Sequence, residues 1–590
     1  MRHSTGWRLS GPRVIPVAWV GVLTLAMVAP TLRPGFTLSY DMVFTPRQDL
    51  LPATLGIGGS LPRAVPQDAV VALAEAVIPG ELLQKAILLA IPLLAGLGML
   101  RLLRHCSLSS RMIAATIVVW NPYVAERLVI GHWGLLLAYA LTPWALATAL
   151  DMRRGRACAG IALILIVAAA SLTPSGSVLA VALTLPLVLA PGSLTSLRAR
   201  ALTAAGLLLC WLPWLVPALA NPGLGQADVQ GAAVFAVRDE GPGVLPTILG
   251  LGGIWNADVA LPSRSWPTAP VLAVVLIVLC IAGIPALART LGRAVVVWWA
   301  AVALAGLAAA AASALLPEAW AALLQSFPGA GILRDAHKWL GPLALLVGAG
   351  AGVFIGGLLA RISDTSVRRA LLVLVALVPV AALPDLAWGA AGRLQAVDYP
   401  SAWEEVREVI AADARPGDVV ALPWSAFRRF PWNADRTVLD PAPRWLTRTT
   451  VVADGLTVST RSGMVTVAGE DPRAREIGRA LADGQPLSQV MGDLGIGWAV
   501  VELGQPPGVA PAALTGLVQV RAGPDLALYV LEGPVRQPEA PAYARWVIAV
   551  DVIVSLVMLA LVGAAGIRGI RMARARRRED ERTPGEPLVR

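Results

Sequence analysis

Three short groups of polar residues lie beside long apolar runs, and their side chains can do chemistry at a membrane surface. The first group is Tyr40-Asp41, with Asp49 shortly after it. A carboxylate at the end of an apolar run can act as a general base that takes a proton from a hydroxyl group. The alternative is structural: Asp41 caps a chain end or forms an ion pair.

The second group starts at Asn121-Pro122, continues to Glu126-Arg127 and ends near His132. Proline interrupts a helix, and charged side chains next to it cannot face lipid at low cost. We therefore expect Glu126, Arg127 and His132 to line a cavity or the outer membrane interface. The structural alternative is a satisfied ion pair between Glu126 and Arg127.

The third group is the stretch that contains Arg334, Asp335, His337 and Lys338. Arg334 and Lys338 are four positions apart, so on a helix they would share one face and could clamp an anionic group. Lys338 and Lys85 are the only lysines in an arginine-rich sequence, which favours a specific role for Lys338. The alternative is an ordinary basic anchor at a helix end.

The composition shows which elements must position these groups. Hydrophobic residues make up 56% of the chain and charged residues 15%, with a mean hydropathy of +0.67. Lipid is therefore the main solvent, and the apolar runs lack the alternation of barrel strands. We predict about twelve spanning helices, near residues 14–32, 82–100, 112–130, 133–150, 157–172, 175–190, 201–220, 268–288, 294–315, 339–360, 369–388 and 544–567.

Arginine-rich turns predict how these spans are oriented, because short basic loops stay in the cytoplasm. If the spans alternate, every predicted inner loop carries at least two arginines; these loops are 101–111, 151–156, 191–200, 289–293 and 361–369. A plasma-membrane protein with both termini in the cytoplasm is the prediction. The net charge of +10 is explained by anionic headgroups rather than by nucleic acid.

The chain divides into three parts. Residues 1–389 form a multi-span transmembrane domain with long outer loops at 33–80 and 221–267, and residues 543–590 form a last spanning helix and a basic cytoplasmic tail. Residues 390–542 are rich in Asp, Glu, Arg, Pro and Trp, which predicts a small extracytoplasmic α/β or α+β domain. We expect helices at 401–413, capped by Ser401, and 472–491, and strands at 418–422, 498–502, 517–521 and 526–531. The four cysteines fit neither a disulfide framework nor a metal site.

Taken together, these residues resemble the GT-C superfamily of membrane glycosyltransferases, especially relatives of the actinobacterial arabinofuranosyl and mannosyl transferases that build cell-wall polysaccharide. Tyr40-Asp41, the Asn-Pro-Tyr with Glu126-Arg127, and the stretch Arg334 to Lys338 carry the resemblance, which covers roughly residues 14–400. It implies transfer of a sugar from a polyprenyl-phosphate donor to an extracytoplasmic glycan or glycolipid acceptor.

The resemblance also implies roles for the three groups. Asp41 would be the general base, and Arg334 and Lys338, with His337 or Arg127, would hold the donor phosphate. Tyr40, Asp49, Glu126, His132 and Asp335 would support the site. Four tryptophans of the soluble domain are candidates to stack on sugar rings or to form its core: Trp403, Trp424, Trp432 and Trp445. Many family members carry an acidic pair where Asp41 stands alone, so dependence on a divalent metal is left open.

The main rival is a non-enzymatic membrane protein, such as a transporter or flippase for a lipid-linked precursor or a scaffold of an envelope complex. A transporter should show two related halves with interrupted spans and charges near the bilayer midplane. The sequence has no internal repeat, and its candidate charges cluster at the outer face. Surface chemistry is therefore the favoured interpretation.

Overall fold

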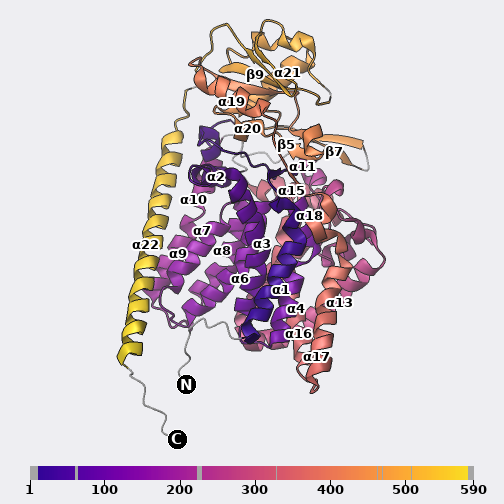
Figure 1. Cartoon of the computed structure of the whole chain (residues 1–590), viewed down its shortest axis with the longest axis vertical. Coiled ribbons are helices and arrows are strands. Elements are labelled where there is room, and N and C mark those ends of the chain that lie inside the picture. Colours follow the sequence, from indigo (N-terminus) through magenta and orange to yellow (C-terminus); the bar gives the residue numbers. More distant parts are fainter. Residues whose placement is uncertain are drawn as a thin grey trace.

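Apolar runs separated by arginine-rich turns fold into a helical bundle in the computed structural model of the chain (Figure 1). The structure describes residues 11–59, 64–221, 229–326, 329–460, 463–467, 469–506, 508–537 and 539–582. Within these ranges eight helices are long and apolar enough to cross a membrane, or nine if one bent pair counts as a single span. The chain is therefore a multi-pass membrane protein.

Eight elements supply the long spans. They are α1 (Gly11–Val28), α3 (Gly80–Leu102), α6 (Trp133–Arg153), α13 (Thr268–Leu291), α14 (Arg293–Leu315), α16 (Gly341–Leu359) with the preceding turn η7 (Ala336–Leu340), α17 (Thr365–Ala382) and α22 (Ala544–Arg582). The bent pair is α9 (Leu197–Leu209) and α10 (Leu212–Ala220), whose axes meet at 49°.

The predicted count of about twelve exceeds the number of full-length spans. Two of the predicted spans are the shorter apolar helices α7 (Ala159–Ala170) and α8 (Pro174–Leu189). The predicted span at 112–130 ends early, because α4 (Leu108–Val119) stops before Asn121 and a separate helix, α5 (Pro122–Val129), follows. Proline lacks the N–H that would continue the first helix, which is the physical reason for this break.

Glycines on one face of α16 let that helix approach α4 closely. A Cβ atom added to Gly352 would lie 2.6 Å from the Cβ of Ala114, and one added to Gly348 would lie 2.5 Å from a methyl group of Val118. Small residues at such a spacing allow backbones to pack tightly inside a membrane. The glycine repeat of this span therefore has a packing role.

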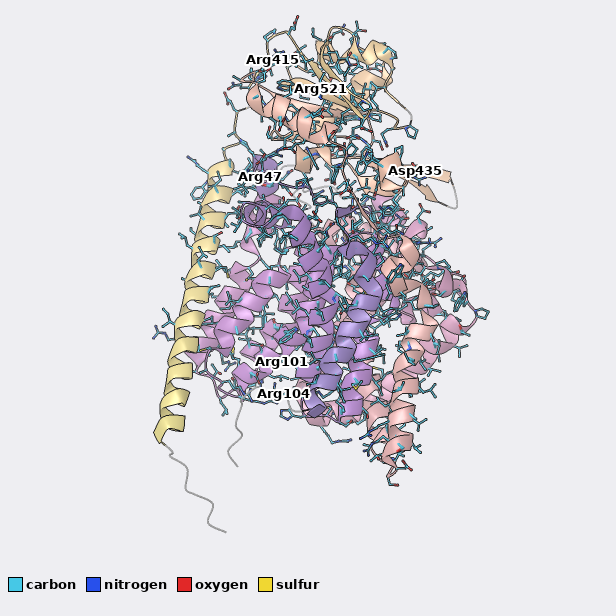
Figure 2. All side chains as sticks on the ribbon, viewed as in Figure 1. Arg47, Arg101, Arg104, Arg415, Asp435 and Arg521 are labelled. Atoms are coloured by element: carbon cyan, nitrogen blue, oxygen red, sulfur yellow. The ribbon has the colours of Figure 1, made fainter. Side chains whose placement is uncertain are left out.

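The arginine-rich turns gather at the end of the bundle that is remote from the sheet domain. Arg101 and Arg104 lie at that end, whereas Arg415 and Arg521 lie in the sheet domain (Figure 2). Arg101 and Arg104 both bind the carboxylate of Asp151, at 3.0 and 2.8 Å, which ties two predicted inner loops together. Residues 1–10 and 583–590 lie outside the described residues, so the cytoplasmic location of the termini stays a prediction.

The soluble domain is built on a five-stranded mixed sheet with the order β10-β11-β9-β3-β6. Its strands are β3 (Asp418–Leu422), β6 (Thr450–Val451), β9 (Ile496–Glu502), β10 (Val518–Ala522) and β11 (Leu526–Val530). β3 pairs in parallel with β9 and β6, and the other pairs are antiparallel. Helices α19 (Ala402–Ala412) and α21 (Pro472–Ala482) accompany the sheet.

The four strands and the helix at 401–413 that the sequence predicted in this domain are therefore confirmed, with shifted ends, whereas the helix predicted at 472–491 ends at Ala482. One predicted detail is wrong: Ser401 makes no capping hydrogen bond at α19, whereas Asp471 caps α21 through the N–H of Arg473. Two hairpins were not predicted. They are β4–β5 (Phe427–Arg429 and Thr437–Leu439) and β7–β8 (Leu456–Thr460 and Gly463–Val467). The strands of β4–β5 have three residues each, which is too short to give an alternating pattern.

The loops after α1 and before α13 place α2 (Gln67–Glu75) and α11 (Val229–Val234) at the end of the bundle that faces the sheet domain (Figure 1). The loop after α1 also contains β1 (Phe36–Thr37), and the long loop before α13 also contains α12 (Val244–Leu249). β1 pairs with β2 (Ala396–Val397) of the segment that enters the soluble domain. The two domains thus share backbone pairing.

Replacing Gly352 by leucine should destabilise the membrane domain, because the new side chain would collide with the backbone of Ala114 on α4. Overpacking of this kind costs about 1–3 kcal/mol. Thermal unfolding of the detergent-solubilised protein, followed by size-exclusion chromatography, measures the effect. Gly357 is the matched control, because an added Cβ atom there meets nothing within 4 Å; an equal loss in Gly357→Leu would contradict the packing role.

Candidate active site

The break between α4 and α5 turns a pair of charged residues into the protein interior. Asn121 caps α5 by accepting a hydrogen bond from the N–H of Val124 at 3.1 Å, and Pro122 occupies the first helical position, where its missing N–H costs nothing. As a result, Glu126 and Arg127 are fully buried. Buried charges persist only when they are paired.

Arg127 is the centre of the resulting polar network. Its guanidinium forms a bidentate ion pair with Asp335, with N–O distances of 2.6 and 2.8 Å. The same two terminal nitrogens contact Nδ1 of His132 at 2.9 Å and Nδ1 of His337 at 2.8 Å. Three groups, from two separate parts of the chain, therefore meet at the Arg127 side chain.

These contacts determine the tautomers of both histidines. A guanidinium can only donate hydrogen bonds, so Nδ1 of each imidazole must accept and carry no proton. The proton of each neutral ring is then on Nε2. His132 donates it to the Asp41 carboxylate at 2.9 Å, and His337 donates it toward the Leu251 carbonyl oxygen at 3.3 Å. Arg127 thus orients a hydrogen-bond donor toward Asp41.

Asp41 is held by its backbone as well as by His132. Its N–H donates to the carbonyl oxygen of Ile130 at 3.1 Å. Gly131 has φ +83°, and a Cβ atom there would collide with the backbone nitrogen of Met42. Only glycine therefore allows the two loops to approach this closely. The Asp41 side chain remains 43% exposed, so one side of its carboxylate is open to a ligand.

The electrostatic surroundings keep Asp41 ionised. Desolvation by the protein would raise the pKa of this carboxyl, but the hydrogen bond from His132 and the positive charges of Lys338 and Arg444 together lower it below its ordinary value. Desolvation and the nearby Arg127 charge lower the pKa of His132, which agrees with a neutral ring. Asp41 is thus an anion held by a neutral donor.

Lys338 interacts with Asp41, but Lys338 and Arg334 do not share one helical face. The chain around these two residues forms the short 3₁₀ turns η6 (Ala330–Leu333) and η7 instead of a continuous α-helix. The prediction that Arg334 and Lys338 share one helical face is therefore wrong. Lys338 lies 3.8 Å from Asp335 and is partly exposed. The Arg334 guanidinium stacks over the ring of Phe235 at 4.2 Å.

The other predicted site residues lie at different distances from this centre. Tyr40 precedes Asp41 and its hydroxyl group lies 3.4 Å from Asp258. Asp49 is bound to Arg407 of α19 at 2.6 Å instead of to a residue of the network. Arg127 and His337 are almost fully buried among protein groups, so in this structure neither is open to a phosphate, which departs from the role expected for them.

The loop 221–267 contributes an arm of the network that the sequence did not predict. Glu126 accepts a hydrogen bond from the N–H of Ile254 at 3.0 Å and lies 3.4 Å from Nε2 of His337. Glu240 of the same loop binds Arg264 at 2.9 Å. The only sequence signal was the presence of charged residues in a loop too long for a connector, and it did not indicate which of them turn inward.

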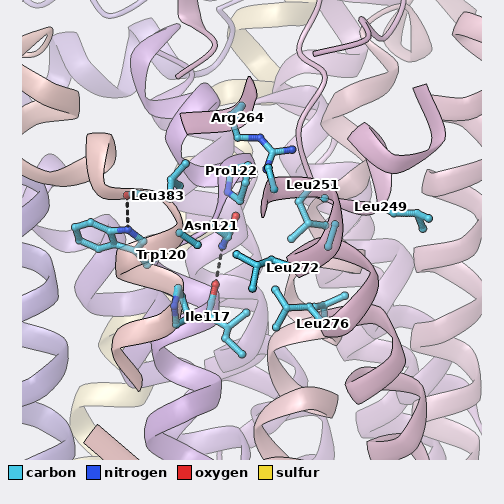
Figure 3. Close-up of a pocket in the computed structure, with 16 residues that line it drawn as sticks. Ile117, Trp120, Asn121, Pro122, Leu249, Leu251, Arg264, Leu272, Leu276 and Leu383 are labelled. Atoms are coloured by element: carbon cyan, nitrogen blue, oxygen red, sulfur yellow. Dashed lines mark hydrogen bonds between the residues drawn. The ribbon is translucent and has the colours of Figure 1, made fainter. Parts of the chain in front are cut away.

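An apolar pocket lies next to Arg264. It is lined mainly by α4, α13, α16, α17 and the loop before α13, with Ile117, Leu272 and Leu276 among its apolar side chains (Figure 3). Arg264 and Asn121 are the polar residues at its wall, and Leu251, whose carbonyl oxygen faces His337, also lines it. The pocket is therefore separated from the polar network by only one layer of residues.

The described residues do not supply a ligand set for a resident metal ion. Within them, no group of three or more His, Cys, Asp or Glu side chains could hold one, and the Asp41 carboxylate is bound by His132. Of the four tryptophans considered for sugar stacking, Trp403 and Trp445 are buried in the core, while Trp424 and Trp432 are partly exposed.

Comparison with known proteins finds relatives by structure but not by sequence. No protein-family model and no curated protein matches the chain. Two structures of the arabinofuranosyltransferase AftD from Mycobacteria match with a TM-score of 0.52 and 18% identity, over 89% of this chain and 42% or 40% of AftD. The oligosaccharyltransferase AglB from Archaeoglobus fulgidus matches with a TM-score of 0.42 and 11% identity, over 84% of this chain and 70% of AglB.

The two AftD structures show the fold: over most of its length the chain is folded like this membrane arabinofuranosyltransferase, in agreement with the resemblance predicted from its sequence. The chain spans less than half the length of AftD.

Replacing Asp335 by asparagine should lower the stability of the protein strongly, because it leaves the buried Arg127 guanidinium without its counter-ion. Breaking a buried ion pair costs about 3–5 kcal/mol. Chemical unfolding in detergent micelles measures the change. Glu476→Gln is the control, since its pair with Arg479 is exposed and is worth at most about 1 kcal/mol; equal losses in the two variants would show that Asp335 does not hold the network.

Proposed function

We propose that this protein transfers a sugar from a polyprenyl-phosphate donor to a glycan or lipid acceptor of the cell envelope, on the extracytoplasmic side of the plasma membrane. One observation carries the proposal. An ionised and half-exposed carboxylate, Asp41, is fixed by a neutral histidine beside a lysine, where the membrane domain meets the soluble domain. The GT-C architecture supports the same conclusion.

The transfer requires a base and a site for the leaving phosphate. The acceptor hydroxyl oxygen attacks the anomeric carbon of the sugar, the bond from that carbon to the phosphate oxygen breaks, and the hydroxyl proton passes to Asp41. The phosphate leaves with the bonding electron pair. Positive charge develops on the sugar and negative charge on the phosphate in the transition state. Asp41 therefore acts on the acceptor side of the reaction.

Lys338 and Arg334 are the groups proposed to bind the donor phosphate. A cation near the phosphate binds more tightly as negative charge builds up, which lowers the barrier. Both side chains are partly exposed, and Lys338 is close enough to Asp41 for each to influence the charge of the other. Arg127 and His337 position this site from the interior instead of touching the phosphate.

The lipid part of the donor needs an apolar environment next to this site. The pocket between α4, α13 and α17 has a suitable lining, and Arg264 stands at its polar wall. We propose that the isoprenoid chain enters along this pocket, which keeps the phosphate at the level of the polar network. An acceptor then reaches Asp41 from the side of the soluble domain.

Asp41→Asn should reduce transfer about 10²- to 10⁴-fold, because the amide keeps the shape of the side chain but cannot accept the proton. The measurement is analysis of envelope glycans and of lipid-linked sugar pools in cells that carry only the variant, where the unused donor should accumulate. Asp483→Asn, at an exposed position of the soluble domain, is the control. Unchanged glycans at normal protein abundance would overturn the enzymatic function in favour of a scaffold.

Lys338→Met should weaken binding of the donor and slow transfer, since it removes a cation from the leaving phosphate but retains the length of the side chain. A loss of about 10-fold or more in kcat/KM for the donor is expected, as one charge-assisted hydrogen bond contributes about 1.5–3 kcal/mol. Lys85→Met changes the only other lysine, which is paired with Glu81, and should leave transfer unchanged. An unaltered kcat/KM in Lys338→Met would exclude Lys338 from the phosphate site.

A further inference from the structure

The segment that carries Asp41 is bonded to the soluble domain through the backbone of the preceding residue. The N–H of Tyr40 donates to the carbonyl oxygen of Thr437 at 2.7 Å, and the N–H of Leu439 donates to the carbonyl oxygen of Tyr40 at 2.8 Å. Both partners belong to β5 of the β4–β5 hairpin. The Tyr40 ring also packs edge-on against Phe427 of the same hairpin.

Tyr40 adopts a backbone conformation that needs such support. Its φ is +44°, in the left-handed region that residues other than glycine rarely occupy. Conformations of this kind persist only where the surrounding structure holds them. The hydrogen bonds to β5 hold Tyr40 on one side, and the bond from the Asp41 N–H to the Ile130 carbonyl oxygen holds the next residue on the other. The hairpin thus helps to set the direction in which Asp41 leaves the backbone.

The hairpin is in turn fixed to the main sheet by one buried arginine. Arg428 of β4 binds Asp440 at 2.6 Å and also contacts Glu502, at the end of β9, and the carbonyl oxygen of Ser425. Arg428, Asp440 and Glu502 are each at most 1% exposed. A second link joins the N–H of Arg429 to the side chain of Gln505 at 2.9 Å. Arg428 is therefore the main polar anchor between the hairpin and the sheet.

The charges of Arg428, Asp440 and Glu502 also suit a permanent structural role for this anchor. Burial raises the pKa of Glu502 well above its ordinary value, and the nearby negative charge of Asp440 acts in the same direction. The charge of Arg428 and its hydrogen bond to Glu502 oppose both effects.

We propose that Arg428 is a positioning residue for Asp41, and that the soluble domain, through the β4–β5 hairpin, is a structural part of the reaction centre. This inference rests on the proposed function of Asp41 as the base. The chain of contacts runs from the sheet to Arg428, from the β4–β5 hairpin to Tyr40, and from Tyr40 to Asp41. The soluble domain thereby orients the group that removes the proton.

The first test measures the backbone contacts without any substrate. The full-length protein in lipid nanodiscs is compared with Arg428→Lys, which keeps the charge but cannot reach three acceptors at once. Amide hydrogen exchange should increase in peptides that cover residues 36–43, with the spanning helices unchanged. Arg521→Lys is the matched control, because its partner Glu405 is half-exposed and lies outside the hairpin. Unchanged exchange at residues 36–43 in Arg428→Lys would overturn the proposal.

The second test measures the consequence for chemistry. Short-chain polyprenyl-phosphoryl arabinofuranose and mannose serve as donors, with synthetic octyl oligosaccharides of the same sugars as acceptors. Arg428→Lys should lower kcat about 10-fold or more while the donor KM changes less than about twofold. The acid limb of its pH profile should also move upward, since a displaced Asp41 loses the hydrogen bond from His132 that favours its ionised form. Normal kcat together with increased exchange at residues 36–43 would overturn the positioning role.

A further variant keeps the proposal testable if Arg428→Lys does not fold. Leu439→Pro leaves Arg428 in place and removes the N–H that donates to Tyr40, so it should reproduce the fall in kcat, and normal kcat would count against the proposal. The proposed function and the positioning role of Arg428 can also be refuted separately. If the wild-type protein transfers neither sugar and Asp41→Asn leaves the cellular glycans unchanged, the proposed function fails. If the wild type transfers sugar but Arg428→Lys does so equally well, only the positioning role fails.

Discussion

The burial of one positive charge, that of Arg127, is the constraint on which the rest of the site depends. A guanidinium placed among spanning helices requires a partner with complementary geometry, and Asp335 supplies it with two hydrogen bonds. The remaining faces of the guanidinium are filled by His132 and His337. Since arginine can only donate, it forces both rings into one tautomer and makes His132 a donor toward Asp41. A structural ion pair in the interior thereby determines the chemical state of a carboxylate at the surface.

The structure divides the side chains that the sequence predicted to bind phosphate into two sets with different roles. The side chains expected to hold a phosphate fall into a buried set, Arg127 with His337, and a partly exposed set, Arg334 with Lys338. Only the second set is open to a ligand. The buried set instead fixes geometry, which matters because a misplaced base loses most of its catalytic advantage.

The sequence predicted which residues form the site better than it predicted how they are arranged. Asp41, Glu126, Arg127, His132, Asp335, His337 and Lys338 were all selected from their positions beside apolar runs, and the structure brings them together. The predicted helical face of Arg334 and Lys338 was wrong, because 3₁₀ turns replace the α-helix there. Glu240 and Arg264 were not recognised as part of the network, since nothing local distinguishes a charge that turns inward from one that faces water. Asp49 was selected by nearness in sequence but binds Arg407 of the soluble domain.

The sequence by itself determined which segments face lipid and which face water: apolar runs of spanning length predicted a multi-span bundle, and their absence between residues 390 and 542 predicted a mixed α and β domain. The break at Asn121-Pro122 was also local information, because proline cannot continue a helix. Only the tertiary structure decided which groups meet. The contacts of Arg127 with Asp335, of Tyr40 with β5 and of Arg428 with Glu502 join residues far apart along the chain. Such contacts depend on the packing of whole elements, which no short stretch of sequence encodes.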